Sequence, residues 1–208
     1  MKIGMIVAMD KELQQLRPLF PEDKVILQKS GIGKVNAAIQ TVEMIRQYKP
    51  DVIISSGCAG GNGDDIYVQD VVVSTELAYH DVYCGTAIGH SVYGQVQGLP
   101  ARFEADPYLL EKARQTGAKP GLIVTGDWFV DSKEKMREII GHFPEAKAVD
   151  MESAAIAQTC YINKVPFISF RVISDIPLRD TDASMYHDFW NTIAQNSFQV
   201  TKTFIESL

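Results

Sequence analysis

The sequence predicts an α/β fold with a largely parallel or mixed central sheet. Strand-like and helix-like segments alternate along the chain, which is the order that strand–helix–strand units produce. The chain has 208 residues, of which 46% are hydrophobic, so it is long enough for one sizeable core and too short for two typical domains. Because no repeat, low-complexity tract or linker interrupts it, we expect a single domain over residues 1–208.

The first half of the chain begins with an apolar, strand-like segment over residues 2–8. A short helix over residues 10–17 ends at Pro18, which cannot continue it. Ala, Ile, Val and Met recur at helical spacing over residues 35–48. The other elements expected here are strands over residues 24–28 and 51–55, a turn over 30–34, a small-residue turn over 57–61 and a strand that begins at Val71.

The second half has an irregular stretch over residues 80–102 that is rich in Gly and Tyr. A loop of this length in a compact domain is usually functional or disordered. The elements expected after it are helices over residues 106–116, 132–142, 148–162 and 183–206, and strands over 121–125 and 166–173.

Composition excludes several classes of partner. The formal net charge of −6 and the absence of a like-charged block argue against nucleic acid or an anionic membrane as the main partner. We find no signal peptide and no apolar run of the ~18 residues that a membrane span needs. The cysteines, Cys58, Cys84 and Cys160, are odd in number and widely spaced, which argues against a disulfide framework and favours the cytoplasm.

Candidate site residues follow the predicted strands, where ligands bind in open α/β sheets. Carboxylates recur at these strand ends, together with glycine-rich turns and an aromatic pair. They are Met9 to Glu12, Ser30 to Lys34, Ser56 to Gly61, Gly126 to Val130, Asp150 to Glu152 and Ser174 to Asp175. Each has an ordinary structural explanation when taken singly: first-turn or N-cap carboxylates, glycines for tight turns, aromatic and Met residues for the core. The four histidines show no metal-ligand spacing.

Taken together, these segments form an ordered set over nearly the whole chain. The set comprises Met1-Lys2-Ile3-Gly4, Ala8-Met9 with Glu12, Lys29 to Val35, Lys49 to Ile54, Ala59-Gly60-Gly61, Tyr79-His80-Asp81, Gly121 to Val124 with Gly126-Asp127, Ala148 to Glu152 and Arg171 to Asp175. The sequence resembles the bacterial 5′-methylthioadenosine/S-adenosylhomocysteine nucleosidases of the purine nucleoside phosphorylase superfamily. The resemblance implies a three-layer α/β/α fold of the nucleoside phosphorylase type, with a mixed central sheet.

The resemblance also implies a role for each matching position. Asp175 would be the general acid that protonates N7 of adenine, and Glu12 would orient and deprotonate the attacking water. Arg171 and Ser174 would support this acid. The other implied roles are ribose binding by Met151 and Glu152, purine binding by Phe129, Val130 and Ser174, support of the site by Cys58, Ala59 and Gly60, and a 5′-pocket formed by Met9, Ile32 and Tyr186.

This division of labour has a physical basis. The transition state is oxocarbenium-like, and adenine leaves poorly unless it is protonated, so the acid needs a pKa raised by burial or by neighbours. A second carboxylate can hold water, and a third can accept bonds from the ribose hydroxyls. Phosphate, the nucleophile of related phosphorylases, needs cationic donors, whereas Glu12 would repel it. We therefore expect a hydrolase that uses no metal and no organic cofactor.

The sequence departs from the family pattern in its specificity residues. The region over residues 18–28 is short where the family usually has an extra hairpin, Cys58 replaces Ser, Asp150 replaces Glu, and Trp128 replaces a small residue. The loop over residues 82–97 is longer than usual, Ile88, His90 and Tyr93 being candidates for its pocket contacts. Residues 176–179 and Tyr186 also differ from the family.

Several functions stay open at this stage. The leading hypothesis is hydrolysis of methylthioadenosine and S-adenosylhomocysteine. The alternatives are a hydrolase for another 5′-substituent (futalosine or 5′-deoxyadenosine), a nucleoside phosphorylase, or a degenerate nucleoside-binding module. The resemblance further implies a homodimer in which the 82–97 loop lends residues to the partner.

Overall fold

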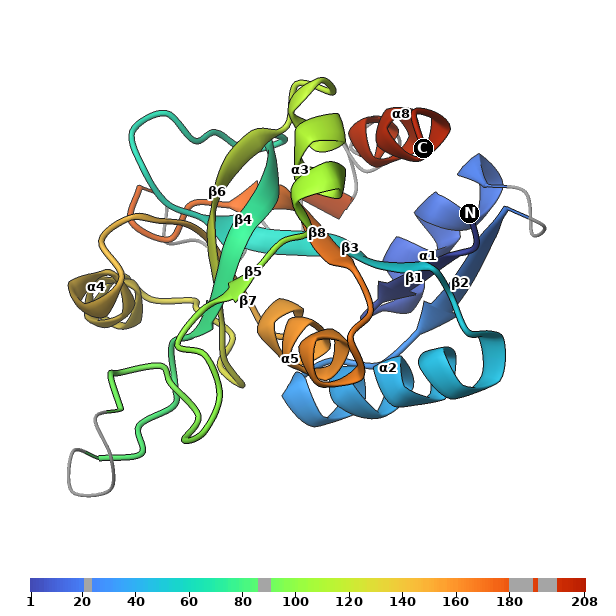
Figure 1. Cartoon of the computed structure of the whole chain (residues 1–208). Coiled ribbons are helices and arrows are strands. Elements are labelled where there is room, and N and C mark those ends of the chain that lie inside the picture. Colours follow the sequence, from blue (N-terminus) through green and yellow to red (C-terminus); the bar gives the residue numbers. More distant parts are fainter. Residues whose placement is uncertain (21–23, 86–90, 180–188, 191–197) are drawn as a thin grey trace.

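The computed structural model describes residues 1–20, 24–85, 91–179, 189–190 and 198–208 (Figure 1). Its strands are β1 (Ile3–Val7), β2 (Val25–Lys29), β3 (Val52–Gly61), β4 (Val71–Tyr79), β5 (Phe103–Glu104), β6 (Lys119–Thr125), β7 (Ala146–Asp150) and β8 (Phe167–Asp175). Its helices are α1 (Asp10–Leu16), the 3₁₀ turn η1 (Arg17–Leu19), α2 (Lys34–Tyr48), α3 (Pro107–Arg114), α4 (Lys133–His142), α5 (Ser153–Asn163) and α8 (Gln199–Glu206). The predicted α/β class is confirmed.

The sheet is mixed and partly closes on itself. Its path runs β2–β1–β3–β7–β6–β4–β5, and β8 pairs with both β3 and β4. The β3–β8, β4–β6 and β6–β7 pairs are parallel, whereas β3–β7 and β4–β8 are antiparallel. Because each of these five strands pairs with two others, they form a ring whose strand ends converge near the residues of the candidate site.

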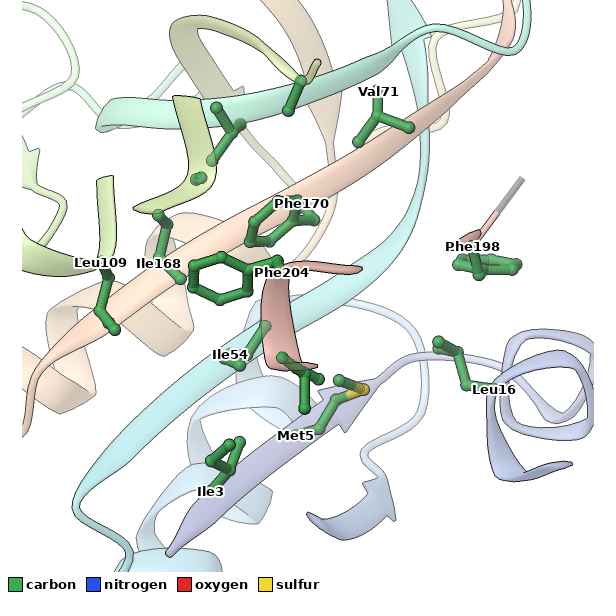
Figure 2. Packing of buried hydrophobic residues seen from close by; sticks show 14 of the residues in the cluster. Ile3, Met5, Leu16, Ile54, Val71, Leu109, Ile168, Phe170, Phe198 and Phe204 are labelled. Atoms are coloured by element: carbon green, nitrogen blue, oxygen red, sulfur yellow. The ribbon is translucent and has the colours of Figure 1, made fainter. Parts of the chain in front are cut away.

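Helices cover both faces of the sheet, as the three-layer prediction requires (Figure 1). Neighbouring residues of β3 show the alternation: Ile54 packs in the cluster that includes α1, α3 and α8, and Ile53 packs in the cluster that includes α2 and α5. In the first cluster the rings of Phe170 and Phe204 lie 4.7 Å apart, with Met5 and Leu109 nearby (Figure 2).

Two predicted boundaries are wrong. The helix expected over residues 148–162 is divided into β7 and α5. Its first residues pair in parallel with β6, Ala148 opposite Ile123 and Asp150 opposite Thr125, so tertiary pairing overrides the helix propensity of alanine. The turn expected over residues 57–61 is instead the second half of β3, paired with β8 as far as Gly60. The two-residue strand β5 was not expected.

The shortened region after α1 holds a single described strand. β2 lies at the edge of the sheet and pairs with β1 in parallel from Val25 to Lys29. The predicted strand over residues 24–28 is therefore confirmed within one residue.

The described part of the 82–97 loop folds back on its own chain. Gly94 N donates to Val82 O at 2.9 Å, and the Tyr93 hydroxyl donates to His80 O at 2.9 Å. The Tyr93 ring also stacks on His142, with ring centroids 3.7 Å apart. Ile88 and His90 lie outside the described residues, as do Tyr186 and most of the predicted C-terminal helix before Gln199.

No helix among the described residues is long and apolar enough to cross a membrane.

Candidate active site

One pocket collects nearly all of the predicted site residues. Its empty volume is about 610 Å³, including the open mouth, which is within the usual range for small-molecule sites. The predicted residues that line it are Met9, Glu12, Ile32, Cys58, Ala59, Gly60, Phe129, Val130, Met151, Glu152, Ser174 and Asp175. Ala8, Trp128, Val149 and Asp150 complete the wall. Of the remaining predictions, Arg171 lies behind the wall, and Tyr186 is outside the described residues.

Glu12 is fixed at one side of the pocket by three backbone donors. Its Oε2 accepts from Ala8 N at 2.8 Å and Met9 N at 3.0 Å, and its Oε1 accepts from Cys58 N at 3.0 Å. The side chain therefore caps the start of α1 and also reaches across to β3. Glu12 is only 2% exposed, and burial raises the pKa of its carboxyl, against the opposing effects of Arg171 and the three N–H donors.

Gly57 makes this close approach of Glu12 to β3 possible. A Cβ at this position would lie 2.6 Å from Glu12 Oε1 and 3.3 Å from Arg171 Nη1, so a side chain would push the carboxylate away. We expect Gly57→Ala to reduce kcat/KM about 100-fold, since a displacement of about 1 Å in a reacting group has that order of effect. Steady-state adenine release checks it.

Gly141→Ala is the matched control for Gly57→Ala. Gly141 is exposed on α4, and a Cβ there would meet nothing within 4 Å. Near-normal activity in both variants would show that Glu12 needs no such close approach.

Arg171 is a buried cation directly behind Glu12. Its Nε donates to Asp150 Oδ2 at 2.6 Å, and Nη2 donates to Ser55 Oγ at 2.8 Å. Asp150 in turn accepts from Thr125 Oγ1 at 2.5 Å and from the Ser153 hydroxyl. The charge of Arg171 lowers the pKa of Glu12 and of Glu152. In the part of the chain that the structure describes, Arg171 thus bonds to Asp150, Ser55 and the Phe170 carbonyl oxygen, and not to Asp175.

Glu152 lies between β7 and α5, facing the turn before α2. Its Oε1 accepts from Gly33 N at 3.0 Å. Burial, together with the charge of Asp150, raises the pKa of Glu152 to about 8. The carboxyl therefore has acceptor positions available for a ligand with paired hydroxyls.

The raised pKa of Glu152 predicts a specific pH dependence of stability. In the folded state Glu152 keeps its proton up to about pH 8, whereas in the unfolded state it releases this proton near pH 4.5. The stability that this difference contributes is therefore complete below pH 4.5 and is lost as the pH rises through about 8. We expect Glu152→Gln to reduce the fall in unfolding temperature between these pH values. Thermal unfolding across pH 4.5–8.5 measures this, with Glu111→Gln, a change of an exposed carboxyl on α3, as the control. An unchanged pH profile in Glu152→Gln would contradict the assignment.

Asp175 ends β8 and lines the same pocket as Glu12. Its Oδ1 accepts from Ser174 Oγ at 2.6 Å. Burial raises the pKa of the Asp175 carboxyl, and the Ser174 bond opposes that rise. A carboxyl that keeps its proton nearer to neutral pH is suited to act as an acid.

Trp128 and Phe129 give the pocket a largely apolar outer wall. They are 54% and 50% exposed, far more than the aromatic residues of the core. Lys135 Nζ lies 4.8 Å from the centroid of the Trp128 ring, which restrains the indole at the mouth of the pocket. Such a wall suits a flat, apolar-faced ligand such as a purine.

The sequence did not indicate the contacts of three residues of the site. Asp150 and Gly57 belong to candidate segments of the sequence analysis, but no contact with Arg171 or Glu12 is predicted for them, and Ser55 is predicted only as a strand residue. In the structure, Asp150 is buried and accepts from Arg171. The only available signal was the density of small and polar residues in Ser55-Ser56-Gly57-Cys58, which is unusual for a buried strand.

Cys58 faces the pocket beside Glu12. Burial and the neighbouring charge of Glu12 raise the pKa of its thiol well above the ordinary value. These effects favour the protonated thiol over the thiolate, which is the nucleophilic form.

Comparisons with known proteins fit this geometry. The sequence profile of the phosphorylase superfamily matches residues 16–206. A curated 5′-methylthioadenosine/S-adenosylhomocysteine nucleosidase from an Exiguobacterium species is 42% identical over 222 aligned positions, which cover 95% of this chain and 94% of that protein. The chain belongs to this nucleosidase family, within the phosphorylase superfamily. The predicted resemblance is confirmed.

Solved structures of the nucleosidase family have the same fold. The Neisseria meningitidis nucleosidase, in complex with methylthio-immucillin-A, has a TM-score of 0.91 and 40% identity, with 100% of this chain and 99% of that chain covered. The Colwellia psychrerythraea nucleosidase, in complex with adenine, has a TM-score of 0.92 and 34% identity, with 100% and 96% covered. The predicted nucleoside phosphorylase-like fold is therefore confirmed across the whole chain.

Proposed function

We propose that this chain hydrolyses the N-glycosidic bond of 5′-methylthioadenosine and S-adenosylhomocysteine and releases adenine. The observation that carries the proposal is the pairing of Glu12 and Asp175 in one pocket, both with raised carboxyl pKa values. One buried carboxyl can supply a proton and the other can accept one, which is what hydrolysis with a basic leaving group needs. Relatives named as nucleosidases for these two substrates support the substrate class.

In the proposed reaction, the pair of electrons of the C1′–N9 bond moves to adenine as the bond breaks. Asp175 transfers its proton to N7 of the leaving base. The water held by Glu12 forms a bond to C1′ and gives its proton to Glu12, so the products are adenine and the 5′-substituted ribose. Solvent then returns a proton to Asp175 and removes one from Glu12.

The other residues of the pocket hold the substrate in this proposal. Glu152 accepts from the ribose hydroxyls beside Met151, while Phe129 and Val130 contact the purine, and Ser174 supports Asp175. Met9 and Ile32 border the 5′-substituent, and Ala59 and Gly60 line the floor next to Cys58. Because these groups complete the chemistry, the proposal requires no cofactor.

Water is favoured over phosphate by the charges of the pocket. Its described lining includes four carboxyls (Glu12, Asp150, Glu152 and Asp175) and no Lys, Arg or His side chain. The one buried guanidinium, Arg171, is already bonded to Asp150 and Ser55. A phosphate dianion would enter a pocket lined by carboxyl groups, without a free cationic partner on the described wall, which is unfavourable.

The deciding experiment is adenine release from methylthioadenosine in phosphate-free buffer and again with added phosphate. We expect the same rate in both buffers, with the free 5′-methylthioribose as co-product. Release only with phosphate would identify a phosphorylase. Binding without release would identify a nucleoside-binding module, and release only from futalosine or 5′-deoxyadenosine would transfer the activity to another 5′-substituent.

We also propose that residues 1–208 work as one domain in a cytoplasmic homodimer. Ile32, in the turn before α2, and Val35 and Ile39, on α2, are exposed apolar residues, and such a cluster commonly marks an interface. The three cysteines are free, as expected in a reducing compartment. Sedimentation equilibrium tests the dimer, and Val35→Glu should weaken it.

A further inference from the structure

Three loops from different strands meet at Lys34, on the rim of the pocket. The loops follow β2 (residues 30–33), β4 (His80 and Asp81) and β6 (residues 126–130). Lys34 Nζ donates to Asp81 Oδ1 at 2.8 Å and Oδ2 at 2.7 Å. It also lies 3.8 Å from Asp127 Oδ2. One ammonium group thus joins all three loops, at the first residue of α2.

Backbone hydrogen bonds connect the same residues. Lys34 N donates to Asp127 Oδ1 at 2.7 Å, and Asp127 N donates to Asp81 Oδ2 at 2.8 Å. The side chains of Lys34 and Asp81 are only 22% and 23% exposed, so solvent screens this cluster less than an ordinary surface pair. Lys34 Nζ further lies 5.4 Å from the ring centroid of Tyr79.

The Lys34–Asp81–Asp127 cluster is joined along the chain to two parts of the pocket. Gly33, immediately before Lys34, donates its N–H to Glu152 Oε1 at 3.0 Å and has a φ of +95°, a conformation that glycine adopts readily. Asp127 immediately precedes Trp128, Phe129 and Val130, which line the purine wall. A shift of the cluster would therefore move the donor to Glu152 and the purine wall together.

We propose that Lys34 is a positioning residue for ribose recognition. It holds the turn before α2 against the loop after β6, so that the Gly33 N–H aims the Glu152 carboxyl at the ribose hydroxyls. This inference rests on the proposed function, because it assigns Glu152 to the ribose. Lys34 itself acts through Gly33 and Glu152 and is not required to touch the substrate.

The test is a thermodynamic cycle in which one change is the substitution Lys34→Met and the other is the removal of a ribose hydroxyl from the substrate. We measure kcat/KM for methylthioadenosine and for its 2′-deoxy and 3′-deoxy analogues in the wild type and the variant. We expect Lys34→Met to lower kcat/KM roughly tenfold for the parent substrate but no more than about twofold for at least one analogue, because coupled sites are non-additive. Lys34→Arg should recover most of the loss.

The controls separate a positioning role from a general loss of structure. Lys202→Met removes another paired lysine, from α8, and should leave all three values unchanged. If Lys34→Met does not fold, Asp81→Asn takes its place in the same cycle, since it removes the charge that pairs with Lys34 at 2.7 Å and keeps the shape. An equal loss for the parent and both analogues, or no loss at all, would overturn the proposal.

The outcome also distinguishes this inference from the proposed function. If the wild type releases no adenine, the proposed function fails before the cycle begins. If the wild type is active and the two changes are additive for both analogues, only the assignment of Lys34 fails.

Discussion

Asp175→Asn is expected to reduce kcat for adenine release by about 10²- to 10⁴-fold, the usual contribution of a general acid. Asn has nearly the same shape, and its side-chain oxygen can still accept from Ser174 Oγ, which lies 2.6 Å from Asp175 Oδ1. It has no acidic proton to give to N7, so the adenine anion would have to leave unprotonated. Substrate binding should stay near the wild-type value, because the proposed contacts to ribose and purine come from other residues.

The measurements for Asp175→Asn are single-turnover adenine release and calorimetric binding of methylthioadenosine. Asp65→Asn is the control, since Asp65 forms an exposed ion pair with Lys147 outside the pocket. Normal turnover in Asp175→Asn would remove Asp175 from the mechanism. A loss of binding equal to the loss of turnover would instead assign it to substrate binding.

The local sequence was sufficient to predict most of the fold. The strand over residues 2–8 and the helix over 35–48 are confirmed within a residue or two as β1 and α2, because their apolar periodicity depends only on neighbouring positions. The helix at 148–162 was wrong at its start, because Ala148 and Val149 are strand residues only through pairing with β6 and β3. The secondary-structure propensity of a segment carries no information about a partner strand that is distant in the sequence.

In the candidate site, too, some residues could be predicted from the local sequence and others depend on distant contacts. Glu12 and Asp175 lie beside predicted strands, so a parallel or mixed topology was enough to bring them together. Glu152 was predicted within the first turn of the helix over residues 148–162, whereas it lies between β7 and α5. Gly57 could not be assigned a role, because its importance depends on a 2.6 Å approach to a residue 45 positions earlier in the chain. Lys34 was noted only as part of a turn, and its three-loop contact becomes visible when β4 and β6 are adjacent.

Arg171→Met is expected to lower the free energy of unfolding by about 3–5 kcal/mol, the usual cost of removing one partner from a buried ion pair. Arg171 is 2% exposed and bonded to Asp150, Ser55 and the Phe170 carbonyl oxygen. Met fills similar space but leaves the buried Asp150 carboxylate without its cation. For a chain of this size, the loss corresponds to a fall in unfolding temperature of roughly 6–20 °C.

The loss of folding stability in Arg171→Met should become larger as the pH rises. Arg171 lowers the pKa of Glu12 and Glu152, so its removal raises both values further above the 4.5 of the unfolded chain. The folded variant binds more protons than the folded wild type only between each wild-type pKa and the higher value in the variant, so its stability falls more steeply in that range. For Glu152 this range begins at about 8, so we expect the difference from wild type to be larger at pH 9 than at pH 5.

Asp150 provides the internal check on this interpretation. If the cost arises from an unpaired carboxylate, Asp150→Asn should recover part of the stability in the Arg171→Met background while destabilising the wild type, since an amide can still accept from Thr125 and Ser153. Chemical denaturation of the four proteins measures that coupling, with Arg114→Met, a change of an exposed arginine on α3, as the control. Strictly additive changes would mean that Arg171 stabilises the fold by packing alone. Coupled changes would instead indicate that the Arg171 guanidinium stabilises the negative charge of the buried Asp150 carboxylate behind Glu12. Removing both partners would then leave Glu12 with a different charge state from the one that the proposed hydrolysis uses.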